Sequence, residues 1–93
     1  MFLEIVTPEA ILFSSEVDAI SVPGVHGEFQ MLNNHAPVVA VLKAGEVKIQ
    51  ASNYTIKEKF QNKFSKATDG KLSLTINSGT LELNDNKVII LAD

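Results

Sequence analysis

Apolar and polar side chains alternate with a period of two along most of this chain, which is the pattern of half-buried β-strands. Frequent turn signals, among them Asn77–Gly79 and Asn84–Asn86, keep the strands short. Many short strands separated by turns predict an all-β fold, an antiparallel sandwich, with one domain spanning residues 1–93. The side chains expected to face the core are Leu3, Ile5, Val47, Ile49, Leu72, Leu74 and Ile76.

Two stretches depart from simple alternation. Val38–Leu42 is continuously apolar, which predicts a strand with both faces covered. The apolar phase shifts between Val17 and Ile20, which predicts a β-bulge near Asp18 and Ala19.

Residues 51–71 do not read as a plain strand. Four of the eight lysines lie between Lys57 and Lys66. Ile56, Phe60 and Phe64 have helical spacing, whereas Tyr54 and Ile56 alternate as in a strand. Two interpretations stay open, an extended hairpin or small excursion with a solvated lysine face and a contact to a neighbouring subunit. We favour the first, and we expect the segment to be dispensable for the core.

The segment Val22–Pro37 concentrates turn chemistry and holds both histidines. Pro23–Gly24 predicts a tight turn with positive φ at Gly24, and Gly27 predicts a second turn or bulge. Asn33–Asn34 tolerates left-handed backbone. So many turns around an exposed Glu28 indicate an interaction surface held by a rigid sheet.

The same segment carries a family resemblance. It follows the pattern P-G-x-x-G-E-F-x-x-L-x-x-H-A-P, and Leu42-Lys43-Ala44-Gly45 comes shortly after it. This pattern, with Leu3–Pro8 as an opening strand and 78–93 as a last hairpin, resembles the epsilon subunit of the bacterial F-type ATP synthase. The resemblance covers residues 1–50 and about 72–93, and it implies a flattened two-sheet β-sandwich. It also implies that residues 51–71 are longer than the usual connection.

The resemblance implies a role and two contact surfaces. The chain would be a non-catalytic rotor subunit of the central stalk, joining gamma to the membrane c-ring and helping couple proton translocation to ATP synthesis. Glu28, Phe29 and Gln30 would face the polar loops of the c-ring. Gln30 stands where the family usually has glycine, which alters how closely this loop approaches the ring. The gamma-facing residues would be Thr7, His35 and Ala40.

Each of the two polar candidates also has a plainer interpretation. Glu28 could be a solvated carboxylate at a loop tip. His35 could bond the backbone and pin the loop before Pro37, and this role is compatible with a contact to gamma.

Composition narrows the function classes. With no arginine and a net charge of −3, the chain lacks the basic face that nucleic-acid binding needs. Its apolar runs are at most five residues long, as at 38–42, which is too short to cross a bilayer. We therefore expect no direct membrane insertion. The resemblance implies a peripheral location in the synthase, on the cytoplasmic face of the bacterial inner membrane.

Enzymatic alternatives find little support. The chain has no cysteine and none of the common nucleophile, metalloprotease or phosphate-loop motifs. Two histidines with Glu28 leave a small zinc enzyme as a distant alternative. A stand-alone β-sandwich binding module is the nearer one. We expect no metal, no cofactor and no small-molecule substrate.

The resemblance also implies a second domain of C-terminal helices in many relatives, which restrains ATP hydrolysis there. The strand pattern here runs to Leu91, two residues before the last one given. From this pattern we expect that the chain does not inhibit hydrolysis by itself.

Overall fold

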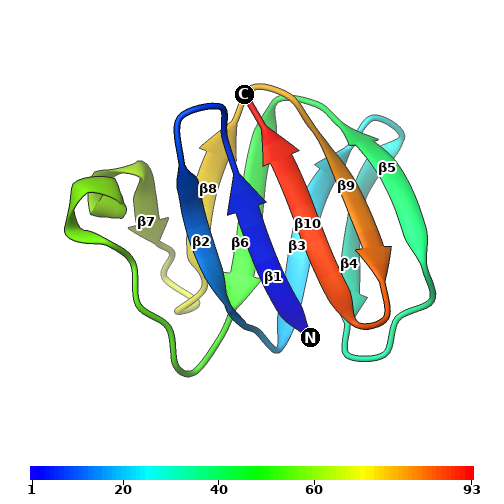
Figure 1. Ribbon diagram of the computed structural model, residues 1–93, viewed down its shortest axis with the longest axis horizontal. Helices are drawn as coiled ribbons and strands as arrows, with labels where there is room; N and C mark the ends of the chain where they lie inside the picture. The colour runs from blue at the N-terminus through cyan, green and yellow to red at the C-terminus, as the bar shows by residue number, and fades with distance from the viewer.

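The computed structural model describes residues 1–93, which form ten β-strands and one short 3-10 helix (Figure 1). The strands are β1 (Phe2–Val6), β2 (Ile11–Glu16), β3 (Ala19–Gly24), β4 (Gly27–Leu32), β5 (Val38–Leu42), β6 (Gly45–Gln50), β7 (Phe64–Lys66), β8 (Leu72–Ile76), β9 (Gly79–Asn84) and β10 (Lys87–Ala92), and the helix η1 spans Glu58–Lys63. The all-β class is confirmed. No helix is long and apolar enough to cross a membrane.

The strands form two facing layers that belong to one hydrogen-bonded sheet. Their order is β2-β1-β10-β9-β5-β3-β6-β8-β7, with β4 paired to β3. In Figure 1, β2, β1, β10 and β9 lie in front of β8, β6, β3 and β4. β5 links the layers, because it pairs with β9 over five residues and with β3 only at Gly24 and Leu42. The pairs are antiparallel, as predicted, except that β1 and β10 are parallel.

The core lies between the two layers. Twenty buried side chains make one apolar cluster, which includes all seven side chains that the alternation placed inward. Close packing of this kind resists deformation.

The prediction of a bulge near Asp18 and Ala19 was wrong. β2 ends at Glu16 and β3 begins at Ala19, so the apolar phase changes because the chain changes strand. The bulge lies earlier, at Leu12, because Ile5 pairs with Phe13 and Val6 pairs with Ile11. Leu12 and Phe13 are consecutive and both buried, which a bulge permits and regular alternation does not.

In the β3–β4 hairpin, the positive φ that was predicted for Gly24 occurs at Gly27 instead. The turn is at Val25–His26, and Gly27, not Gly24, has a positive φ of 126°. Gly24 is required by crowding, since a Cβ there would lie 2.8 Å from the Gly27 carbonyl oxygen and 3.0 Å from the Phe29 ring. Asn34 adopts left-handed backbone with φ 64°, as predicted.

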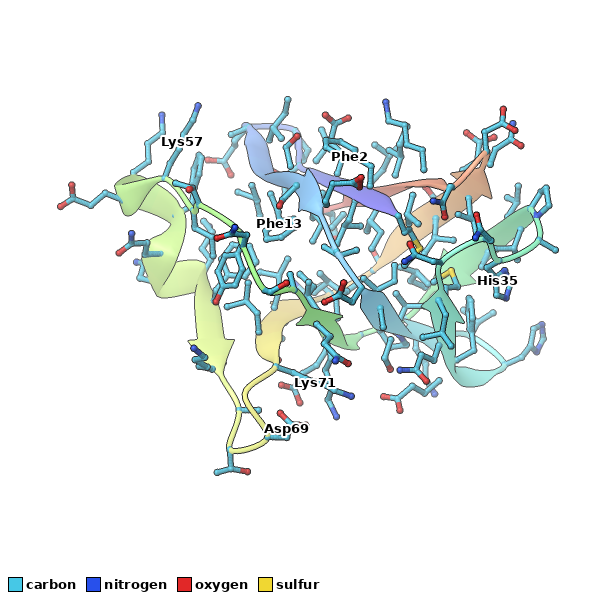
Figure 2. The ribbon with its side chains drawn as sticks, turned by 90° about the horizontal axis from the view of Figure 1, so that it is seen from below. Phe2, Phe13, His35, Lys57, Asp69 and Lys71 are labelled. Atoms are coloured by element: carbon cyan, nitrogen blue, oxygen red, sulfur yellow. The ribbon has the colours of Figure 1, made fainter.

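Residues 51–71 form the small excursion predicted from the sequence. After η1 the chain forms β7, which pairs with β8. Lysines 57, 59, 63 and 66 are all exposed, and Figure 2 shows Lys57 at the outer edge of the excursion. The spacing of Ile56, Phe60 and Phe64 is not one helical face, because Phe60 lies in η1 and Phe64 begins β7.

The apolar side of the excursion packs on the core. Tyr54, Ile56, Phe60 and Phe64 are half-buried against the core cluster. The ring centroids of Tyr54 and Phe64 lie 6.1 Å and 6.2 Å from that of Phe13. Phe13 is only 2% exposed, so the excursion contributes to its burial.

Candidate docking surfaces

The β3–β4 hairpin brings the three predicted c-ring-facing residues to one strand. Glu28 pairs with Pro23 at the start of β4, Phe29 with Val22 and Gln30 with Ser21. Successive side chains of a strand point to opposite faces, so Glu28 and Gln30 share one face and Phe29 takes the other. Accordingly, Glu28 and Gln30 are exposed, while Phe29 is half-buried against the core.

A shallow hollow of about 500 Å³ lies between this hairpin and β5. Its walls come from Gly24 to Phe29 on one side and Val39 to Val41 on the other. The hairpin and β5 are held together by the Val25 N–H, which donates to the Val41 carbonyl oxygen at 3.1 Å. Ala40, predicted to face gamma, is half-buried and lines this hollow beside Glu28 and Phe29.

Thr7 caps the turn between β1 and β2. Its N–H donates to the Ala10 carbonyl oxygen at 2.8 Å, and its Oγ1 donates to the same oxygen at 3.1 Å. Thr7 lines a second, open hollow of about 570 Å³, together with Val41, Thr80 and Leu91.

His35 lies in the β4–β5 loop, at the other end of the strands from Thr7 (Figures 1 and 2). Its Nδ1 donates to the Ala36 carbonyl oxygen at 2.7 Å, and its backbone N–H donates to the Leu32 carbonyl oxygen at 3.2 Å. The Asn34 N–H donates to Asn86 Oδ1 at 2.9 Å, which ties the loop to the β9–β10 turn. These bonds fit the expectation that His35 pins the loop.

The two predicted sets therefore differ in their geometry. Glu28, Phe29 and Gln30 are consecutive on one strand. Thr7, His35 and Ala40 are spread over both strand ends and the hairpin hollow, so they do not form one patch. Their roles stay predictions.

Sequence reasoning missed an apolar row on the outer face of the front layer. Strand pairing aligns Ile11 with Val6, Val6 with Leu91, Leu91 with Thr80, and Thr80 with Val41. Ile11, Leu91 and Val41 are 50%, 53% and 57% exposed. We call these five residues the outer row.

The outer row also corrects the prediction for Val38–Leu42. That strand is not covered on both faces, since Val39 is 77% exposed and Val41 is 57% exposed. The sequence feature that could have revealed the outer row is the pair of strands at 38–42 and 88–91, which are apolar at successive positions. Such strands are either buried on both sides or present an apolar face outward.

The side chains considered for zinc do not converge. His26 and Glu28 lie at the β3–β4 hairpin, whereas His35 lies at the opposite strand end. No group of three or more potential metal ligands occurs, so the three-ligand zinc site has no geometric basis.

Comparison with known proteins identifies relatives over the whole chain. Residues 1–93 match the family described as ATP synthase, Delta/Epsilon chain, beta-sandwich domain. The ATP synthase epsilon chain of Campylobacter curvus is 38% identical over 93 residues, which are 100% of this chain and 60% of that protein. That of Dehalococcoides mccartyi is 36% identical over 91 residues, 98% of this chain and 54% of the relative. The chain thus spans somewhat more than half the length of these relatives.

Solved structures share the fold at low sequence identity. A chain of the Tetrahymena thermophila mitochondrial ATP synthase central stalk and c-ring superposes with a TM-score of 0.72 at 17% identity, covering 99% of this chain and 62% of that one. A chain of the Euglena gracilis mitochondrial ATP synthase also gives 0.72, at 22% identity, covering 97% and 48%. The match over residues 1–93, with relatives above 30% identity, places this chain in the beta-sandwich domain family of ATP synthase delta and epsilon chains.

Proposed function

We propose that the chain is a non-catalytic component of the ATP synthase rotor, joining the gamma subunit to the c-ring at the foot of the central stalk. The observation that carries the proposal is the outer row, a largely apolar band of four aliphatic side chains and Thr80 on a regular sheet face, with Ile11, Leu91 and Val41 exposed. Contiguous exposed apolar surface of this kind marks sites of protein–protein contact. Family membership makes stalk subunits the first candidates for the partner.

Gamma would bind along the outer row. Thr7 lies in the hollow that Val41, Thr80 and Leu91 also line, so it belongs to this surface. Ala40 and His35 lie outside the row and would support the interface indirectly, Ala40 by packing beneath the hairpin hollow and His35 by holding the β4–β5 loop.

The polar loops of the c-ring would meet the β3–β4 hairpin. Val41 lines both hollows, so the gamma surface and the hairpin are continuous. A tightly packed body between two such contacts would transmit torque with little deformation. In a bacterium, the chain would then lie peripherally on the cytoplasmic face of the inner membrane.

Retention on immobilised gamma tests the proposal with a matched pair of leucines. Leu91 and Leu32 are 53% and 56% exposed, but only Leu91 belongs to the outer row. Wild type and Leu32→Gln should be retained, while Leu91→Gln should bind about tenfold less, since a central apolar contact contributes more than about 1 kcal/mol. If gamma ignores the wild-type chain, the stand-alone binding module becomes the better interpretation.

A further inference from the structure

Charge is unevenly distributed between the excursion and the rest of the chain. Residues 51–71 hold five lysines and two acidic residues, a net charge of +3. The remaining residues hold three lysines and nine acidic residues, a net charge of −6, and the two parts sum to the formal −3. A small basic arm therefore projects from an acidic body. We call Lys57, Lys59, Lys63 and Lys66 the arm lysines.

The arm lysines are not used to hold the fold. The one ion pair within 4.0 Å joins the N-terminal amine to Glu16 at 3.7 Å, so no lysine is paired with a carboxylate. All four arm lysines are exposed. Lys59 lies over the Phe60 ring at 5.2 Å from its centroid, and this contact leaves its charge facing water.

The η1 part of the arm shares a strand end with the β3–β4 hairpin turn, whereas Lys66 lies toward the other end, because it pairs with Leu72 at the start of β8. Phe60 and Lys63 of η1 line a groove with Pro8, Ile76 and Asp93, at the end where β1 turns into β2 and β8 into β9. In Figure 1 the Val25–His26 turn lies at this same end, on the other side of the molecule. The longest dimension of the molecule is 32 Å. A surface that the hairpin tip approaches therefore also lies within reach of η1.

The composition of the arm favours a hydrated, negatively charged surface over a protein interface. The outer side of η1 is formed by Lys57, Glu58, Lys59 and Asn62, without an apolar residue that could serve as an anchor. Protein interfaces are depleted in lysine and depend on buried aromatic, methionine and arginine side chains. Lysine is a strongly hydrated point charge, and each lysine near a membrane surface contributes about 1 kcal/mol to the attraction of anionic headgroups.

We propose that the excursion is an electrostatic contact to anionic phospholipid headgroups, which steadies the domain beside the ring while the hairpin meets the ring itself. The contact rests on the proposed function for its position next to a membrane. It involves no insertion, because the arm offers only charged and polar side chains to the surface.

Vesicle flotation with two charge-matched variants tests the contact. The arm variant changes Lys57, Lys59 and Lys63 to glutamine, and the body variant changes Lys43, Lys48 and Lys87 to glutamine. Each triple removes three positive charges and takes the formal net charge from −3 to −6. Each also removes one lysine that lies over a phenylalanine ring, Lys59 over Phe60 or Lys87 over Phe2.

Flotation uses phosphatidylglycerol–phosphatidylcholine vesicles at about 10 mM salt, where the Debye length is about 30 Å. Wild type and the body variant should float, and the arm variant should bind at least about tenfold less, since each lysine near the surface contributes about 1 kcal/mol. Binding should disappear at about 1 M salt. Equal binding by both variants, or equal binding to pure phosphatidylcholine, would overturn the proposal.

Retention on gamma separates this contact from the proposed function. The arm variant should still be retained by gamma, since Lys57, Lys59 and Lys63 lie outside the outer row. If it floats normally but loses gamma, the arm binds an acidic protein surface and the lipid proposal is wrong. Loss of gamma binding by Leu91→Gln, with flotation unchanged, would leave both proposals standing.

Discussion

The two sides of the sandwich differ in how their apolar surface is covered. At the β2–β8 side, the excursion lays Tyr54 and Phe64 against Phe13, and the chain covers its own apolar surface. At the β5 side, Val39 and Val41 remain exposed, and no part of residues 1–93 covers them. The segments that form both sides are rich in apolar residues. The comparison indicates which apolar surface belongs to the fold and which is available to a partner.

Removing the excursion is the strongest way to break this comparison. Replacing Ser52–Asp69 with an Asn-Gly turn was expected to leave the core intact. The packing of these four half-buried side chains on the core argues for a loss of about 3–6 kcal/mol in the free energy of unfolding, about half of a full burial for each of Tyr54, Ile56, Phe60 and Phe64. Urea unfolding of the wild-type chain and of the shortened chain measures this loss. A loss below about 1 kcal/mol would mean that the excursion is only a surface loop.

Truncating Phe13 measures how much the buried ring under the excursion contributes to stability. Phe13→Ala should lower the free energy of unfolding by about 3 kcal/mol, because a buried ring leaves a cavity. Phe64→Ala should cost less, about 1–2 kcal/mol, because Phe64 is half-buried. A double-mutant cycle gives their coupling energy. Simple additivity would show that the two rings do not support each other.

Reversing the charge of Glu28 tests the hairpin as a contact surface. Glu28→Lys should change the free energy of unfolding by at most about 0.5 kcal/mol, since the side chain is exposed and forms no ion pair. Against a basic c-ring loop it would introduce repulsion and lower proton-driven ATP synthesis in the assembled enzyme. Synthesis at the wild-type rate across salt concentrations would remove Glu28 from the contact.

Changing Val41 should have the smallest effect on folding. Val41→Thr keeps a β-branched side chain at an exposed strand position, so stability should stay within about 0.5 kcal/mol of wild type. Retention on gamma should nevertheless fall, because Val41 ends the outer row. Leu81→Ala, its buried neighbour on β9, should instead cost about 2–5 kcal/mol in stability. Thermal unfolding of both variants provides the measurement.

Local pattern determined much of this protein. Strict alternation placed Leu3, Val47 and Leu72 inward because a strand has two faces and only one meets the core. Asp85 and Asn86 adopt positive φ, as their residue types favour in a tight hairpin turn. The Glu28 hairpin was identified for the same reason, since its turn residues are adjacent in sequence.

Tertiary structure decided what depends on strand order. The outer row joins residues 6, 11, 41, 80 and 91, which only the pairing of β2, β1, β10, β9 and β5 brings together. Continuous apolar runs do not say whether their second face is covered by this chain or left for another. Likewise, the lysines of residues 57–66 stand out in the sequence, but only the fold places Lys63 of η1 at the same strand end as the hairpin turn and leaves Lys66 toward the other end. Periodicity reports local geometry, while burial and docking depend on contacts between segments far apart in the chain.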